Sequence, residues 1–345
     1  MEYLDIIRDN FKNHSPIPWW TKFAFHYTDI TNVVNILKSG ILYSRADATF
    51  LNVMSNDNAS RSIIDMTDPQ TISRVRFYFR PMTPTQYHNE GYKHPYIRYN
   101  GDSNANVPVP IFLLFDLNKL LNFPDIQFSE TSQAGRGAEL YSGVDRFSKL
   151  EFDKIYDKSV ADVESTKQYR HAEIICSKPF SIANALEHIL CRNDIERSTL
   201  LNLLKDTDEQ AFLKYQSMIK VPKKNVFFNN GLFVSVCSLH DDMIYIEFSN
   251  TYARKQYMET AMKRMKIEKL NPVVVDIRLE WCQERRVVWE ESIIANVNAE
   301  KPIDALKIKK IPDIPSANSL GIKVYFDSKL MCYAIRSLGY SEVLE

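Results

Sequence analysis

The segment Val75–Tyr87 constrains the fold most, because its two halves follow different backbone rules. Residues 74–80 (RVRFYFR) place β-branched and aromatic side chains at alternating depth, the pattern of a buried strand. Pro81 cannot continue the hydrogen-bond ladder of a sheet, whereas Thr83 can cap a helix that has Pro84 at its first position. The segment therefore predicts a strand that runs directly into a helix.

This join is expected to place the side chains of Tyr78, Arg80 and Tyr87 around one rim. Two stretches without periodicity, 44–73 and 129–146, read as irregular surface loops. The other elements expected in the first two thirds of the chain are strands at Trp19–Tyr27, Pro110–Phe115 and His171–Cys176, helices around Val33–Leu37 (capped by Asp29 or Thr31 and ended by Gly40), Leu150–Gln168 and Ile195–Leu204, and a hairpin at Asn230-Gly231.

A second unit is expected after Ser238. Its pattern predicts strands at Met243–Phe248, Pro272–Ile277 and Arg286–Trp289, with a long basic helix at Asn250–Lys266. The fold class is therefore α+β, with one domain over 1–230 and an accessory α+β domain or extension over 238–345.

Composition excludes several classes of protein. With 45% hydrophobic and 25% charged residues the chain can bury a core, and no apolar run is long enough for a membrane span. The amino terminus lacks the pattern of a signal peptide, so we expect a cytoplasmic protein with five reduced cysteines. Lys plus Arg and Asp plus Glu both number 43, so a nucleic-acid partner would need a local basic patch.

Two side chains are candidates for catalysis. Cleavage of the nicotinamide bond of NAD develops positive charge on the ribose carbon, and an anionic group at a strand end would stabilise it. Glu173, set in the apolar run Ala172–Ile175, could supply that group, although a strand glutamate is more often an ion-pair partner. His26, which ends an aromatic strand, could orient the dinucleotide or be an ordinary core histidine. Neither a glycine-rich dinucleotide fingerprint nor a metal-binding motif is present, so we expect no metal.

The order of three segments resembles a known family. Residues 25–28 (FHYT), the segment Val75–Tyr87 and residues 169–173 (YRHAE) closely resemble the DarT toxins, ADP-ribosyltransferases that use NAD to modify bases in single-stranded DNA. The resemblance runs from about residue 20 to Phe228. It implies a split mixed β-sheet core with flanking helices, and NAD as a consumed co-substrate instead of a permanent cofactor.

The resemblance also implies roles for individual residues. Glu173 matches the catalytic glutamate of the family. Arg61 is the best-placed match for the family's catalytic arginine, which lies in the loop before the aromatic strand, and Arg74, Arg76 and Arg80 are the other candidates for this role. The residues expected to bind NAD are His26, Tyr27, Thr28, Asn35, Tyr43, Tyr78 and Phe79. The segment Val75–Tyr87 would form the floor of that pocket.

The acceptor and the partners are less constrained. Basic and aromatic residues near Glu173 suit a phosphate backbone and an extruded base, and the candidates for nucleic-acid binding are Lys154, Lys158, Tyr169, Arg170 and His171. We expect single-stranded DNA as the acceptor with RNA as the close alternative, and a toxin of a toxin–antitoxin or phage-defence system. The basic C-terminal helix could extend the nucleic-acid track or dock an antitoxin protein or a chaperone.

Two alternatives remain open at this point. The chain could be a catalytically inactive module that binds nucleic acid or a partner, or a transferase that modifies protein side chains. The second alternative would share the NAD pocket and differ only in the acceptor loop 129–146.

Overall fold

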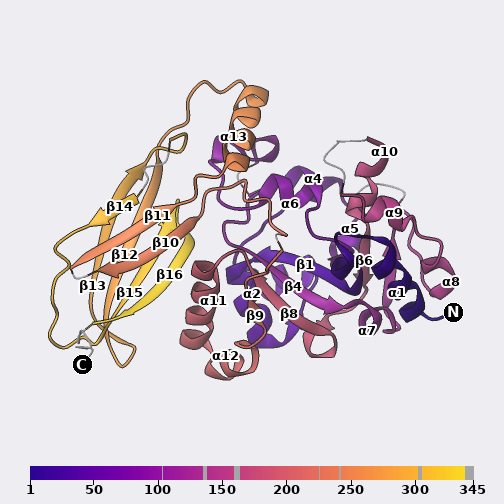
Figure 1. Ribbon diagram of the computed structural model, residues 1–345, viewed down its shortest axis with the longest axis horizontal. Coiled ribbons are helices and arrows are strands. Elements are labelled where there is room, and N and C mark those ends of the chain that lie inside the picture. Colours follow the sequence, from indigo (N-terminus) through magenta and orange to yellow (C-terminus); the bar gives the residue numbers. More distant parts are fainter. Residues whose placement is uncertain are drawn as a thin grey trace.

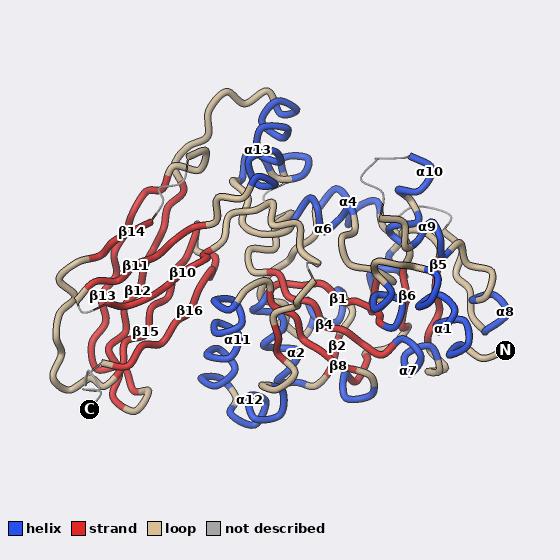
Figure 2. Tube along the Cα trace, viewed as in Figure 1, coloured by secondary structure: helices blue, strands red, loops and turns tan. Residues whose placement is uncertain are grey.

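The computed structural model describes residues 1–102, 104–134, 138–158, 164–224, 226–240, 242–301 and 305–338. Within them, a helix-flanked mixed sheet fills the N-terminal part, and two further sheets fill the C-terminal part (Figures 1 and 2). This confirms the predicted α+β class with a C-terminal extension. Among the described residues, no helix has the length and apolar character needed to cross a membrane.

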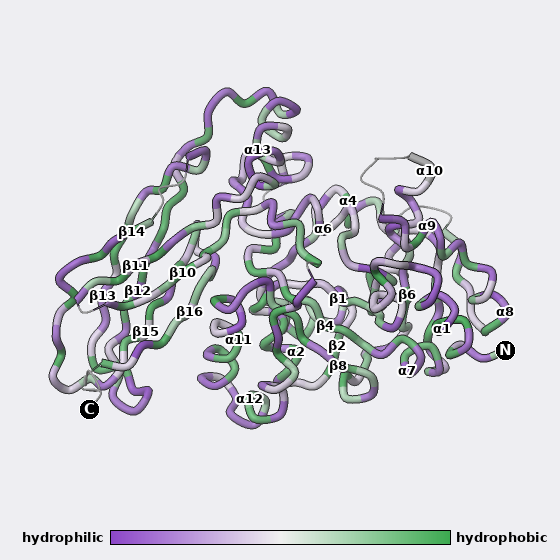
Figure 3. The backbone as a smooth tube through the Cα atoms, viewed as in Figure 1, coloured by the Kyte–Doolittle hydropathy of each residue, from purple (hydrophilic) through white to green (hydrophobic). Residues whose placement is uncertain are grey.

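The N-terminal sheet has seven strands in the order β5-β6-β3-β1-β4-β8-β9. Its pairs are antiparallel except β8 with β9, so the sheet is mixed. Strand β4, which lies next to the middle strand β1, is hydrophobic from Ile111 to Phe115 (Figure 3). These five residues are buried on both faces of the sheet. The strands are β1 (Phe23–Asp29), β3 (Val75–Tyr78), β4 (Pro110–Asp116), β5 (Ile126–Ser129), β6 (Glu173–Cys176), β8 (Leu186–Cys191) and β9 (Ile219–Lys220), and β2 (Ile41–Leu42) pairs with β7 (Phe180–Ser181) apart from them.

Helices surround this sheet and fill most of its connections. The α-helices are α1 (Tyr3–Asn13), α2 (Ile30–Ser39), α3 (Arg45–Phe50), α4 (Arg61–Met66), α5 (Pro69–Ile72), α6 (Pro84–Asn89), α7 (Leu117–Leu121), α8 (Val144–Phe147), α9 (Phe152–Ile155), α10 (Glu164–Lys167), α11 (Asp194–Thr207) and α12 (Glu209–Tyr215). The 3₁₀ turns are η1 (Pro18–Lys22), η2 (Pro95–Ile97), η3 (Tyr99–Gly101), η4 (Tyr169–His171) and η5 (Ile182–Asn184).

The predicted strand-to-helix join is confirmed. β3 buries Val75 and Phe77 and turns Arg76 and Tyr78 to its other face, as the two-residue period requires. The Thr83 hydroxyl accepts a hydrogen bond from the Gln86 N–H at 3.2 Å, and Pro84 begins α6. Asp29 caps α2 in the same way, and Gly40 ends it with φ 70°, a left-handed conformation that suits glycine.

Several local predictions were wrong. The first part of the strand expected at Trp19–Tyr27 is the turn η1, because Pro18 opens a helical turn there. The loop expected over 44–73 contains the short helices α3, α4 and α5. A polar residue occupies the N-cap position of each helix, namely Ser44, Ser60 and Asp68. The long helix expected over 150–168 is only α9 and α10, with residues 159–163 outside the described part. In the loop 129–146, residues 135–137 also lie outside it.

The rim expected around the join does not form. The Arg80 guanidinium turns away from Tyr78 and donates to the carbonyls of Ile155 at 2.9 Å and Pro81 at 3.1 Å, with Trp20 beneath it. Tyr87 packs edge-on against Phe228 at 5.2 Å. Arg80 and Tyr87 lie beyond the end of β3, so their directions follow the turn into α6 and not the strand.

The hairpin predicted at Asn230-Gly231 is also wrong. Leu232 exchanges two backbone hydrogen bonds with Tyr92, at 2.7 and 3.0 Å, instead of pairing with residues 226–228. A Cβ on Gly231 would come within 2.6 Å of the Gly91 Cα, so glycine serves a close backbone approach at this position. The Asn230 side chain accepts from Lys93 and donates to the Tyr87 carbonyl.

The C-terminal part contains two antiparallel sheets and one helix, α13 (Tyr252–Met265). The sheets have the orders β10-β11-β14 and β13-β12-β15-β16. Met243–Phe248 is β11 as predicted, while the other predicted strands are longer than expected. Their bounds are β10 (Val234–His240), β11 (Met243–Phe248), β12 (Val273–Gln283), β13 (Arg286–Val297), β14 (Ala305–Ile308), β15 (Ser319–Phe326) and β16 (Lys329–Ser337).

The turn between β15 and β16 touches the N-terminal part. The Tyr92 hydroxyl donates to the Asp327 carboxylate, and the rings of Tyr92 and Phe326 lie 5.4 Å apart. Lys329 Nζ donates to the side-chain oxygen of Asn56 at 2.8 Å. This turn therefore braces the segment that carries Asn56.

Candidate active site

A cavity of about 270 Å³ opens beside β1 and β3. Its walls come from the end of β1, from α2, from the segment 41–72 and from the pocket-facing side chains of β3. Six of the seven residues predicted to bind NAD line it, namely His26, Tyr27, Thr28, Asn35, Tyr43 and Tyr78. The seventh, Phe79, is fully buried and packs 6.2 Å from the Phe147 ring, because it lies on the opposite face of β3 from Tyr78.

His26 is held in one orientation. Its Nδ1 lies 3.0 Å from the Arg76 carbonyl oxygen, which can only accept, so Nδ1 carries the proton. Burial lowers the pKa of His26 more than this hydrogen bond raises it. The imidazole is therefore neutral at neutral pH and is positioned by the backbone of β3.

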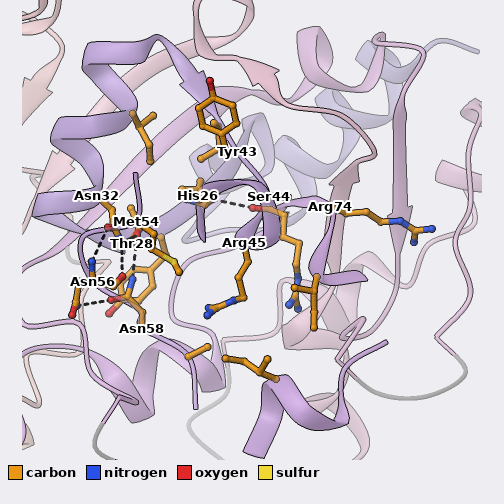
Figure 4. A pocket seen from close by; sticks show the side chains of 18 of the residues that line it. His26, Thr28, Asn32, Tyr43, Ser44, Arg45, Met54, Asn56, Asn58 and Arg74 are labelled. Atoms are coloured by element: carbon orange, nitrogen blue, oxygen red, sulfur yellow. Dashed lines mark hydrogen bonds between the residues drawn. The ribbon is translucent and has the colours of Figure 1, made fainter. Parts of the chain in front are cut away.

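Asparagine side chains pin one wall of the cavity (Figure 4). Asn32 Nδ2 and Asn58 Nδ2 each donate to the Thr28 hydroxyl at 3.1 Å. Asn32 also exchanges two hydrogen bonds with the Asn56 backbone, at 2.7 and 3.0 Å, and Asn56 Nδ2 donates to Asn58 at 2.8 Å. These residues were missed from the sequence, although the asparagine-rich run 52–58 was a signal for them.

The same wall holds Asn35 and Arg45. Asn35 Nδ2 donates to the Val53 carbonyl at 2.8 Å and to the Ser55 hydroxyl at 2.9 Å, which ties α2 to the loop after α3. Arg45, which also lines the cavity, forms an ion pair with Asp57. The Tyr27 hydroxyl is buried and has no hydrogen-bond partner among the described residues. This wall is thus rich in neutral donors and acceptors.

Glu173 and Arg76 form a buried ion pair at the edge of the cavity. Glu173 is 0% exposed, and Arg76 donates from Nε to its Oε2 at 2.8 Å and from Nη2 to its Oε1. Although burial by itself would lower the pKa of Arg76, the Glu173 carboxylate raises it above its ordinary value. Ser132 Oγ, from the loop after β5, lies 3.4 Å from the same carboxylate. Since Arg76 and Ser132 line the cavity, both separate Glu173 from its interior.

The register of the sheet produces this pair. Tyr78 of β3 lies directly opposite Glu173 of β6, so both side chains share one face with Arg76, two residues away. Burial raises the pKa of Tyr78, and the charge of Arg76 opposes that rise. A phenol, a guanidinium and a carboxylate therefore meet where β3 and β6 border the cavity.

The structure places the other candidate arginines elsewhere. Arg61 begins α4 with an exposed side chain, and its backbone N–H donates to Asp102. Arg74 lines the cavity, whereas Arg80 is committed to backbone carbonyls. Of the four arginines considered, Arg76 alone contacts Glu173 among the described residues.

The residues predicted to bind nucleic acid lie close to one another, and some of them already contact other side chains of the chain. Lys154 Nζ lies 4.8 Å from the centre of the Tyr169 ring, and Arg170 pairs with Asp157 at 2.9 Å. Lys158 is exposed. Burial, then the charges of Arg76 and Lys167, lower the pKa of His171 to about 4, so this side chain is neutral near the Glu173 pair. No cluster of three or more potential metal ligands occurs among the described residues.

Comparison with known proteins identifies the family. The family model described as ssDNA thymidine ADP-ribosyltransferase, DarT, matches residues 25–220, more than half of the chain. The chain belongs to the DarT family. It is therefore an NAD-dependent ADP-ribosyltransferase, as the sequence predicted, with NAD as the donor that is consumed.

Solved DarT structures are also similar to this chain. Thermus sp. 2.9 DarT in complex with carba-NAD+ is 19% identical, covers 60% of this chain and 97% of that one, and has a TM-score of 0.45. Thermus sp. 2.9 DarT in complex with ADP-ribosylated ssDNA is 19% identical over 55% and 90% of the two chains, with a TM-score of 0.43. Thermosipho africanus DarTG in complex with ADP-ribose is 15% identical over 60% and 51%, with a TM-score of 0.45. No curated protein matches.

Proposed function

We propose that this chain transfers the ADP-ribosyl group of NAD to a base of single-stranded DNA, with thymidine as the first base to test. The observation that carries the proposal is the Arg76–Glu173 pair at the edge of a cavity lined by His26, Thr28 and Tyr78. The description of the family supports thymidine, and RNA enters as an alternative acceptor in the test.

In this reaction the bond between nicotinamide and the ribose C1′ breaks, and nicotinamide leaves with the bonding electrons. A nucleophilic atom of the base then bonds to C1′ and releases a proton. The cation-like ribose is stabilised by the fixed negative charge of Glu173. Neutral His26, Thr28 and the asparagine side chains of the cavity wall orient the donor through uncharged hydrogen-bonding groups.

The position of Arg76 suggests a second role in the site. Its guanidinium holds both oxygens of Glu173, so it sets the direction of the carboxylate and, with Ser132, lies between it and the interior of the cavity. We propose that Arg76 and Glu173 act together, and that Arg61 acts from the surface at the acceptor side. Arg76→Gln should then abolish transfer to every acceptor, whereas Arg61→Gln should change the KM for the strand.

The deciding experiment incubates the protein with labelled NAD and separate pools of single-stranded DNA, single-stranded RNA and protein. Label on DNA is expected, and oligonucleotides that lack thymidine should remain unlabelled. Glu173→Gln keeps the shape of the side chain and removes its charge, so it should lower transfer at least 100-fold. The change leaves Arg76 without its ion-pair partner, so thermal unfolding checks that the variant is still folded at the assay temperature. Glu187→Gln, which breaks the surface pair with Lys119 (2.6 Å), is the matched control. Label on protein alone would overturn the proposal.

We further propose that residues 1–230 carry the transferase, that 238–345 form an accessory domain, and that the enzyme acts as a toxin held in check by an antitoxin. Induced expression in bacteria should stop growth for the wild type and for Glu187→Gln but not for Glu173→Gln. Normal growth with active enzyme present would contradict the toxin role.

A further inference from the structure

The helix α13 lies outside the matched residues 25–220, yet it lies along the same edge of the molecule as α6 and α10 (Figure 1). Five exposed cations follow its surface and the turn after it, against two exposed carboxylates, Glu259 and Glu268. The cations are Lys255, Lys263, Arg264, Lys266 and Lys269. Within the described part of the chain, no ion pair involves any of the five.

Aromatic rings join α13 to α6. Tyr87 of α6 packs 5.3 Å from Tyr257 of α13, and the Tyr257 hydroxyl donates to the His88 carbonyl at 3.2 Å. His88 in turn lies 4.5 Å from the Tyr99 ring. Tyr87 remains 37% exposed, so part of its ring faces solvent beside the basic helix.

This aromatic cluster continues toward Glu173. The turn η4, which ends two residues before Glu173, packs against α6. Burial, then the charges of Arg264, Lys93, Lys167 and His171, lower the pKa of His88 to about 4. The charges of Arg264 from α13 and of Lys167 from α10 thus act on the same part of α6.

We propose that the exposed face of α13, together with Tyr87, binds the backbone of the acceptor strand on one side of the base that is modified. The inference rests on the proposed function and gives the C-terminal extension a role in it. Exposed lysine and arginine side chains suit phosphates, and an exposed ring beside them suits an unstacked base. The surface carries five exposed cations against two carboxylates, with the partly exposed ring of Tyr87 beside them, which favours a flexible single strand over a folded acidic protein.

The test measures binding of labelled single-stranded DNA by fluorescence anisotropy, with oligonucleotides of about 4 and about 16 nucleotides, which span the site sizes of common single-strand-binding folds. The variant Lys263→Gln/Arg264→Gln is compared with Lys307→Gln/Lys309→Gln, which removes the same charge from β14 and the residue after it. Loss of two phosphate contacts should reduce the slope of log K against log salt by about 1.4. If the variant and the wild type bind the long strand equally at about 1 M salt, the variant should therefore bind it roughly 25-fold more weakly than the wild type at about 0.1 M.

The short strand should bind the α13 variant as it binds the wild type, and the β14 control should leave both strands unaffected. If the α13 substitutions leave binding of the long strand unchanged, the inference is overturned. The same result is expected if the helix binds an acidic protein instead of DNA. Failure of the proposed function is distinguishable, since the wild type would then leave DNA unlabelled while its α13-dependent binding persisted.

Discussion

Replacing Arg76 by methionine tests the pair at the centre of the site. The change leaves the Glu173 carboxylate, 0% exposed, with only the Ser132 hydroxyl at 3.4 Å. Removing one member of a buried ion pair costs about 3–5 kcal/mol, and we expect about 3 kcal/mol because the Arg76 side chain is 30% exposed.

Urea unfolding at pH 8, followed by tryptophan fluorescence, measures the loss. Arg74→Met is the control, since Arg74 lines the same cavity and forms no ion pair among the described residues, and it should cost less than about 0.5 kcal/mol. The double variant Arg76→Met/Glu173→Gln should recover at least about 1 kcal/mol relative to Arg76→Met. Equal costs for the two arginines would refute the argument.

Three further outcomes are expected. Thr83→Ala removes the cap of α6 and should lower the free energy of unfolding by about 1 kcal/mol, and an unchanged urea midpoint would contradict the cap. Burial is the main cause that lowers the pKa of His171 to about 4, so the contribution of His171 to folding stability is complete above pH 6.5 and is lost as the pH falls toward 4. His171→Gln should flatten this part of the plot of unfolding free energy against pH. An unaltered slope would argue against this role of His171. Lys329→Met removes the hydrogen bond to the Asn56 side chain and should raise the KM for NAD several-fold with kcat unchanged. Lys309→Met, the control, should alter neither constant. Equal KM values for the two variants would exclude a role of the β15–β16 turn in bracing Asn56.

Local signals predicted much of the fold. Thr83 and Pro84 specify the start of α6 through bonds within four residues, and the alternation in β3 specifies its buried face. The hairpin at Asn230-Gly231 failed because Gly231 is required for contact with Gly91, 140 residues earlier in the chain, and a local pattern carries no record of that contact.

The candidate site likewise contains residues that the sequence predicted and residues whose positions depend on contacts between distant segments. The resemblance to the family predicted six of the residues that line the cavity, since the FHYT run and Tyr78 are contiguous in sequence with their strands. The catalytic arginine was left among four candidates, because the contact of Arg76 with Glu173 depends on the register of β3 on β6 across 97 positions. Phe79 was predicted to face the NAD pocket and is instead buried in the core. The alternation of side chains in β3 already required Phe79 to lie on the same side as Phe77.

The adjacency of β1, β3 and β6 has a consequence for how such an enzyme can change over time. His26, Arg76 and Glu173 sit on three neighbouring strands, so their separation is set by the fixed spacing between strands, about 4.8 Å for each step. The segments that join these strands can lengthen, shorten or acquire whole sheets without altering that spacing. New acceptors are therefore accessible through insertions in the connections, while a one-residue slip of β3 would replace Arg76 and Tyr78 by Phe77 and abolish the donor site at once.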